Sequence, residues 1–327
     1  MAPKASSTEA ISPTNFNRTW AWSLSPTTIQ NGWQRYRYTM TENGVSRSWW
    51  VHVFRAWNIV PAVTRTNRRE RVTSISPNPA WFPNNQITCR VNGNYFDNHG
   101  PVWFHGIYFT RFGDRTELAK DGVINPTDPA HLAANIGEGQ GGWFRYSPSF
   151  CIAPNMTANI HWISHQGGNQ RITLAQAQSR YNRIIPGMHC LVHNSRPVFD
   201  IRSYSWEGVT IADWSRTLNS DGLHNIWNHH NHRLGSENCR RYRRRTLLGH
   251  VRSNNSFLMV VVEGVDDWGD HTGSGMDLRT ASRFMFDMGC DYAINLDGGT
   301  PSQMYTGNTR RYGGPVGHPV GSTVCAF

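Results

Sequence analysis

The sequence predicts an α/β (α+β) fold, in which a mixed β-sheet core carries few helices and long loops. Three observations in the last quarter of the chain predict it. Residues 256–262 form a continuous apolar run, residues 277–288 show helical spacing of apolar side chains, and residues 291–296 form a second apolar run. A doubly buried strand, a helix and a strand in this order predict a crossover within one sheet, which is right-handed in nearly all proteins.

The first 45 residues are rich in Ser, Thr, Asn and Trp and show no clear period. We therefore predict that residues 1–45 are an N-terminal extension, partly irregular. The first strand signal is residues 48–57, where aromatic and β-branched residues dominate. A second strand is predicted at residues 87–91, followed by a turn-forming run at residues 92–97.

The middle of the chain, residues 100–235, mixes short apolar runs with clusters of Gly, Pro and Asn such as residues 137–142. This pattern is typical of strands joined by long loops. Within it, residues 173–185 carry apolar side chains at intervals of three and four, which predicts a helix.

The boundaries of the C-terminal elements are marked by their flanking residues. Glu263 ends the apolar run at 256–262, and Asp277 is placed to cap the helix that follows. Gly289 stands where a helix C′ residue belongs. Asp297 and two glycines form the turn after the last predicted strand.

Composition excludes two classes of protein. Hydrophobic residues make up 38% of the chain, with no run near the roughly 18 apolar residues that a membrane-spanning helix needs. The aromatic content of 12% excludes a disordered chain. The formal net charge is +10, and all basic residues except Lys4 and Lys120 are arginine. Either codon usage explains this bias, or some guanidiniums bind phosphate or carboxylate.

The N-terminus lacks the apolar core of a signal peptide, so we expect a cytoplasmic or virion-associated protein rather than a secreted one. Six cysteines are widely separated, without a C-x-x-C motif, which argues against a zinc ribbon or thioredoxin chemistry. The sequence leaves open whether they form up to three disulfides or remain buried thiols.

Asp297 and Glu263 are the candidate carboxylates. Asp297 follows a buried strand, at the end where ligands of α/β sheets gather, and Gly298 and Gly299 let a substrate approach backbone N–H groups. The alternative is a turn that only reverses the chain. Glu263 ends an uncharged strand, so we expect the partial burial that suits a general acid. The alternative is a solvated carboxylate.

Two basic clusters are less informative. The arginine-rich run 240–245 is typical of a solvated face or a nucleic-acid patch, although Arg245 precedes apolar residues and is therefore placed to point inward. Nucleic-acid binding rests on this run and the net charge alone, and we do not favour it. Four histidines lack both helical spacing and an interleaved acidic ligand, so no metal site is predicted: His224, His229, His230 and His232.

Five segments, in order, carry a resemblance to a known family. They are residues 91–97, 245–249, 260–264, 274–278 and 293–302. Together they resemble the phosphodiester glycosidase family, over roughly residues 46–327. The resemblance implies one family domain at 46–327, a mixed α/β fold, and hydrolysis of a sugar-1-phosphodiester. We expect no cofactor, and the sequence leaves a bound divalent cation open.

The resemblance also implies roles for individual residues. Asp297 and Glu263 would be the carboxylates that act on an oxocarbenium-like transition state, and Arg245 would hold the phosphate. The groups implied to bind sugar or phosphate oxygens are Asn92, Asn94, Gly298, Gly299 and, as a weaker candidate, Ser302.

One departure from the family pattern supports an alternative function. Thr300-Pro301-Ser302 stands where the family commonly has a Gly and two Ser, and Pro301 has no N–H to offer an anion. With the many Trp and Tyr residues, this turn also fits a non-catalytic structural or carbohydrate-binding protein, for example a virion component in a homo-oligomer.

Overall fold

The computed structural model describes most of the chain outside its N-terminus and the long central loops. The described residues are 9–10, 19–30, 32–42, 44–66, 68–83, 86–94, 96–97, 103–104, 107–120, 123–124, 148–164, 172–187, 189–198, 203–206, 209–212, 242–264, 274–313 and 318–327.

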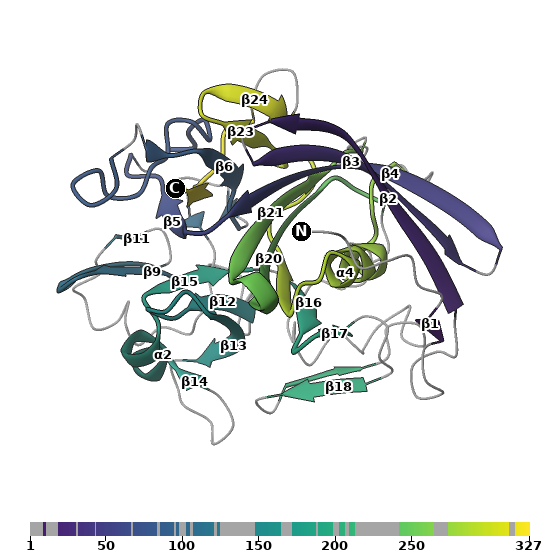
Figure 1. The fold of residues 1–327 in the computed structure, drawn as a ribbon. Coiled ribbons are helices and arrows are strands. Elements are labelled where there is room, and N and C mark those ends of the chain that lie inside the picture. The colour runs from purple at the N-terminus through teal and green to yellow at the C-terminus, as the bar shows by residue number, and fades with distance from the viewer. Residues whose placement is uncertain are drawn as a thin grey trace.

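A nine-stranded sheet forms the centre of the molecule (Figure 1). Its strands, in spatial order, are β1 (Glu9–Ala10), β2 (Thr19–Gln30), β3 (Trp33–Glu42), β4 (Val45–Ala56), β21 (Ser256–Val262), β20 (Arg245–Val251), β22 (Tyr292–Asn295), β16 (His189–His193) and β17 (Arg196–Pro197). Every neighbouring pair in this sheet is antiparallel. The predicted fold class, a β-sheet core with few helices, is confirmed. Strands β21 and β22 run parallel to each other only because β20 lies between them.

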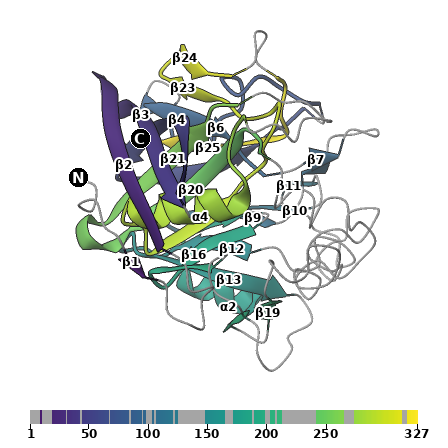
Figure 2. The same cartoon turned by 90° about the vertical axis from the view of Figure 1, so that its right-hand side faces the viewer.

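Two further sheets complete the β-structure. The seven-stranded sheet contains β11 (Val123–Ile124), β10 (Arg115–Lys120), β9 (Ile107–Phe112), β15 (Arg183–Pro186), β12 (Pro148–Ile152), β13 (Ala158–Ser164) and β14 (Ile172–Thr173). The five-stranded sheet contains β24 (Thr309–Tyr312), β23 (Met304–Thr306), β6 (Cys89–Asn92), β25 (Ser322–Ala326) and β5 (Ile59–Val63). Two separate pairs are β18 (Ser203–Trp206) with β19 (Val209–Ala212), and β7 (Phe96–Asp97) with β8 (Trp103–Phe104). In both views the central sheet lies between the β23–β24 hairpin and the seven-stranded sheet (Figures 1 and 2).

The C-terminal elements have the boundaries that the sequence predicts. Strand β21 is buried along its whole length. Helix α4 (Leu278–Asp287) follows, and the Asp277 carboxylate caps it by accepting the Thr280 N–H at 2.7 Å. Gly289 adopts a φ of +84°, as a C′ glycine does. The connection β21–α4–β22 is therefore the predicted strand–helix–strand unit, spanning β20.

The predicted helix at 173–185 is wrong in its second half. Helix α2 (Leu174–Arg180) begins with a Thr173–Gln176 capping box, but Tyr181 is already extended. Strand β15 follows and pairs with both β9 and β12. Tertiary pairing therefore decides the structure of this segment over its helical spacing.

Residues 19–42 form two long strands rather than irregular chain. On β3 the buried side chains of Tyr36, Tyr38 and Met40 alternate with more exposed neighbours, and Tyr38 packs edge-on against Phe284 of α4 at 5.0 Å. The β3–β4 hairpin pairs Glu42 with Val45, so it crosses the boundary predicted at residue 45. That domain boundary itself stays a prediction.

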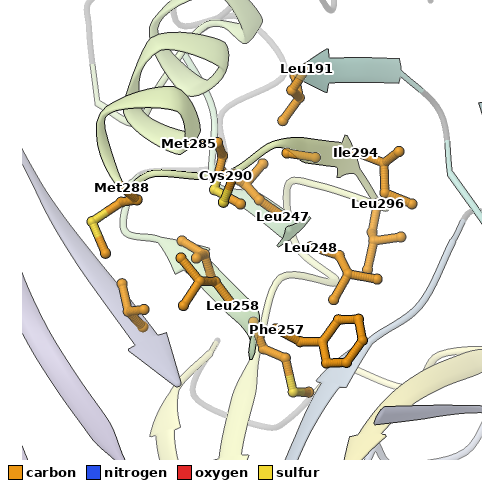
Figure 3. Close-up of a cluster of buried hydrophobic side chains, with 14 of the residues drawn as sticks. Leu191, Leu247, Leu248, Phe257, Leu258, Met285, Met288, Cys290, Ile294 and Leu296 are labelled. Atoms are coloured by element: carbon orange, nitrogen blue, oxygen red, sulfur yellow. The ribbon is translucent and has the colours of Figure 1, made fainter. Parts of the chain in front are cut away.

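The main core packs on both faces of the central sheet (Figure 3). Helix α4 covers one face, and on the other Phe257 of β21 packs edge-on against Phe150 of β12, with ring centroids 6.2 Å apart. Met285 of α4 and Cys290 approach β20 at Gly249, where an added Cβ would lie 2.5 Å from both sulfur-bearing side chains. Cys290 is one of five buried cysteines that form no disulfide in the described part of the chain; Cys239 lies outside the described residues. Among the described helices none is long and apolar enough to span a membrane.

Candidate functional site

One end of the central sheet carries the candidate carboxylates and Arg245. Arg245 begins β20 opposite Val262, the last residue of β21. Asn295 ends β22 opposite Leu247. Antiparallel pairing therefore brings the start of β20 beside the ends of β21 and β22, from which Glu263 and Asp297 follow.

Asp297 lies in a tight, buried turn at this end. Asp297 is only 5% exposed, and its backbone N–H donates to Gly93 O at 3.1 Å. At Gly298 an added Cβ would lie 2.8 Å from Arg244 O, so only glycine fits against β20. Gly299 has a φ of +72° and donates its N–H to Arg244 O at 2.9 Å. The Gly299 N–H is therefore used within the fold and is not the free anion donor that the sequence predicts.

Asn92 holds the Asp297 turn against two strands. Its Nδ2 donates to Asp297 O at 2.8 Å. Its Oδ1 accepts the Thr246 hydroxyl at 2.7 Å and the Gln303 N–H at 3.1 Å. The side chain is buried and bonded within the protein at both ends, which makes Asn92 a positioning residue rather than a group directed at substrate.

Asn94 lies in a neighbouring network with Tyr108 and Ser322. The Asn94 N–H donates to Tyr108 Oη at 3.2 Å, Tyr108 Oη is 2.7 Å from Ser322 Oγ, and Ser322 Oγ donates to Asn94 O at 3.3 Å. Burial, and to a smaller extent the charge of Asp297, raises the pKa of Tyr108 above its usual value of 10.0. Tyr108 is therefore a protonated phenol beside the Asp297 site.

Arg245 points inward, as its position before an apolar run predicts. The residue is 3% exposed, and its Nε donates to Met276 O at 2.9 Å. Its Cδ would lie 3.7 Å from a Cβ on Gly298, so the guanidinium stem passes the Asp297 turn. Burial, and then the charge of Arg245, lowers the pKa of His189 well below 6.5. A neutral imidazole and a buried cation therefore share this side of the sheet.

Glu263 lies on the opposite face of the sheet from Arg245. Because Arg245 pairs with Val262, Glu263 stands opposite Arg244, and side chains alternate between faces along a strand. Its Oε1 accepts Arg35 Nε at 2.7 Å and His52 Nε2 at 2.8 Å. Burial alone raises the pKa of Glu263, but the hydrogen bonds from His52 and Arg35 outweigh it and lower the pKa. The ionised Glu263 does not fit the general-acid role that its position suggests.

Ser302 lies directly after the Asp297 turn. Its N–H donates to Gly299 O at 3.0 Å and closes a turn over Thr300 and Pro301, so the missing N–H of Pro301 costs this turn nothing. Ser302 Oγ is buried and has no hydrogen-bond partner among the described residues. The hydrogen-bonding capacity of this hydroxyl is therefore unused within the described part of the chain.

Sequence reasoning missed other polar residues of this end. Asn295 and Gln303 each have a buried side-chain oxygen without a partner in the described part of the chain. His189 pairs with Asn295 across β16 and β22. The signal for Asn295 was available, because it stands only two residues before Asp297, at the end of the strand that leads into the Asp297 turn.

The described residues contain no group of three or more His, Cys, Asp or Glu side chains suited to hold a metal ion. The four histidines considered as ligands, residues 224, 229, 230 and 232, lie outside the described residues. The expectation of a metal-free site stays a prediction.

The sequence identifies the family to which this protein belongs. The model of the phosphodiester glycosidase family matches residues 157–326, which is more than half of the chain. The chain belongs to the phosphodiester glycosidase family. The predicted resemblance is thereby confirmed.

A solved structure shares the fold at low sequence identity. The chain is similar to the catalytic domain of zebrafish N-acetylglucosamine-1-phosphodiester α-N-acetylglucosaminidase, described as auto-inhibited by its pro-peptide. The match has a TM-score of 0.53 and 15% identity, and covers 99% of this chain and 86% of that one. A hypothetical protein from Synechocystis matches with a TM-score of 0.49 and 10% identity, over 93% of this chain and 63% of that one. No curated protein matches the sequence.

Proposed function

We propose that this protein hydrolyses a sugar-1-phosphodiester and releases the sugar from a phosphate-bearing partner. Family membership supports the reaction class. The observation that carries the proposal is the placement of Asp297: a buried carboxylate at a strand end, in a turn held by Asn92 and passed by the stem of Arg245.

The chemistry required matches these groups. Cleavage at the anomeric carbon develops positive charge on the sugar, which a carboxylate stabilises or attacks, and we assign this part to Asp297. Phosphate is already a good leaving group, so a cation and N–H donors suffice for it. Arg245, the Gly298 N–H and the Ser302 hydroxyl are the proposed phosphate contacts. Glu263 is the second proposed carboxylate, ionised and approaching from the Arg244 side.

Asp297→Asn tests the proposal. Wild-type protein should release sugar from at least one member of a panel of sugar-1-phosphodiesters that includes N-acetylglucosamine and simple hexoses. Asp297→Asn should lose about 100-fold or more in kcat while keeping its far-UV circular dichroism, because the neutral amide cannot stabilise the developing charge. Asp114→Asn, on the exposed β9–β10 turn, is the matched control and should retain full activity. Equal turnover by folded Asp297→Asn would remove this residue from the reaction.

A non-catalytic carbohydrate-binding protein is the second candidate. One observation favours it: Asn92 and the Gly299 N–H, two groups expected to bind ligand, are bonded within the protein. Saccharide binding by wild type without turnover of any phosphodiester in the panel would support this candidate over the enzyme.

A further inference from the structure

A row of side chains crosses the central sheet and ends at the Asp297 turn. Arg37 of β3 lies opposite Trp50 of β4, and the Glu263 N–H donates to Trp50 O at 2.9 Å. The register of β20 and β21 places Arg244 opposite Glu263. We call Arg37, Trp50, Glu263 and Arg244 the cross-strand row. It spans four neighbouring strands, or about 14 Å at the usual strand spacing.

The inner end of the row adjoins the proposed reaction centre. Arg244 O accepts the N–H of Gly299, two residues after Asp297, and lies 2.8 Å from the position of a Cβ on Gly298. Arg244 lies at the same end of the sheet as Asp297, so a chain that extends from a phosphodiester at Asp297 can pass around this end onto the face that carries the row.

The row and its surroundings carry an excess of positive charge. Glu263 is already paired with Arg35. Within the described part of the chain, no carboxylate pairs with three further arginines, Arg37, Arg244 and Arg311. Arg37 is exposed, and Arg244 uses its Nε for Gly264 O at 2.8 Å. This surface is complementary to several negative charges along one ligand.

Aromatic rings lie against three guanidiniums of this surface, those of Arg35, Arg244 and Arg311. Arg35 Cζ lies 4.3 Å from the centroid of the Trp50 ring, and Arg244 Cζ lies 5.8 Å from that of Tyr312. On the five-stranded sheet, Arg311 Cζ lies 4.6 Å from the Trp33 ring. Cation–π contacts fix the cations without neutralising them. The rings are thereby occupied, which disfavours the base stacking that single-stranded nucleic acids use.

Hydroxyl groups extend the same face beyond Arg37. Thr39 Oγ1 lies 2.8 Å from Ser48 Oγ, and Thr41 Oγ1 lies 2.6 Å from Ser46 Oγ. These are exposed hydroxyls of alternate residues on β3 and β4, on the face that carries Arg37 and Trp50. Hydroxyls of this kind are suited to hydrogen bonds with sugar hydroxyls.

We propose that the cross-strand row binds a saccharide chain that carries further phosphate groups, so that the substrate is a phosphate-bearing polysaccharide rather than a small diester. The inference rests on the proposed function and names the substrate class of that site. The phosphates contact Arg37, Arg244 and Arg311. The sugar units contact the exposed part of Trp50 and the hydroxyls of Thr39, Thr41, Ser46 and Ser48.

Binding measured without turnover tests the proposal. The probe is phosphorylated dextran, compared by calorimetry in Asp297→Asn protein with neutral dextran of equal length and with an oligothymidylate of equal charge. Phosphorylated dextran should bind and neutral dextran should not. Arg37→Gln should raise the Kd for phosphorylated dextran about three- to fivefold, the range for an exposed charge contact. It should also make the salt dependence of binding shallower, because fewer counterions are released.

Arg115→Gln is the matched control, since Arg115 is exposed on β10 of the other sheet. An equal loss in Arg115→Gln would show diffuse charge attraction and overturn the proposal. Oligothymidylate binding as tight as that of phosphorylated dextran, with the same dependence on Arg37, would overturn it in favour of a nucleic-acid surface. Arg37-dependent binding of phosphorylated dextran by a wild-type protein that cleaves no diester would overturn the proposed hydrolase function but support the cross-strand row as a binding surface. Cleavage of small diesters without such binding would overturn only the proposal that the cross-strand row binds substrate.

Discussion

At the scale of single residues, the site contains two kinds of group: those that we propose contact a ligand, and those that hold the site itself in shape. Asn92 matches the family motif, yet its side-chain amide forms hydrogen bonds with Asp297, Thr246 and Gln303. The presence of Asn92 in the motif is thus explained by its holding Asp297 in position. The sequence pattern alone cannot distinguish these roles, because both require the same amide at the same place.

Arg35→Gln should raise the pKa of Glu263. Arg35 and His52 both hydrogen-bond Oε1 and together hold that pKa below its usual value, so removing one donor weakens the stabilisation of the carboxylate. The measurement is the NMR titration of the Glu263 side-chain carboxyl carbon in wild type and variant. Arg115→Gln should leave the titration unchanged. A Glu263 titration that does not move in Arg35→Gln would show that this ion pair is absent in solution.

At the scale of elements, the packing of α4 on β20 depends on one glycine. Gly249→Ala should destabilise the protein by about 1–3 kcal/mol, as overpacking of a dense core does. Its Cβ would lie 2.5 Å from both Cys290 Sγ and Met285 Cε. Urea unfolding gives the free energy of unfolding.

The matched test is a second substitution that removes one of the clashing atoms. Cys290→Ala in the Gly249→Ala background should recover part of the loss, so the two changes should be non-additive. Strict additivity would mean that the helix moves away from the strand freely, contrary to the close contact seen at Gly249.

Elements were predictable where local signals and tertiary pairing agree. The apolar run of β21, the Asp277 cap and the C′ glycine of α4 all point to one structure, and each is found. Helix α2 was predicted too long because Ile184 fits both helical spacing and the strand that β9 and β12 impose. Strand β3 was missed, although Tyr36, Tyr38 and Met40 alternate along it.

At the scale of the whole molecule, acid should destabilise the fold. Burial lowers the pKa of His189 well below 6.5 and also lowers that of His250. As the pH falls below the unfolded value near 6.5, the unfolded chain takes up protons that the folded chain does not, so the free energy of unfolding decreases. The lowered pKa of Glu263 acts in the same direction: its contribution is present above about pH 4.5 and is lost as the pH falls through the folded value.

The measurement is urea unfolding between pH 5 and 8. Wild type should lose stability steadily below about pH 6.5, by at most about 1.4 kcal/mol per pH unit for each histidine. The double variant His189→Gln/His250→Gln should show a flatter curve, whatever its absolute stability. A parallel pH dependence in wild type and double variant would show that these two imidazoles do not control acid stability.

The candidate site was only partly predictable because it is assembled from distant segments. Asp297, Arg245 and Glu263 were each marked by a buried strand beside them in the sequence. Their arrangement was not, since strand parity places Glu263 and Arg245 on opposite faces once Arg245 pairs with Val262. His189 escaped notice because its link to Arg245 exists only after β16 docks beside β22.

The strand order also determines when this protein can fold during its synthesis. Val51 pairs with Val262, and Ile59 pairs with Ala326, so both of these strands wait for partners that lie 211 (262 − 51) and 267 (326 − 59) residues further along the chain. Such long-range pairing makes folding slow, since loop closure precedes any gain from contact. Until then β4 presents an open edge with buried-type side chains, which can pair with a neighbouring chain. Recombinant yield should therefore depend on holding the nascent chain apart from its copies until β21 and β25 have left the ribosome.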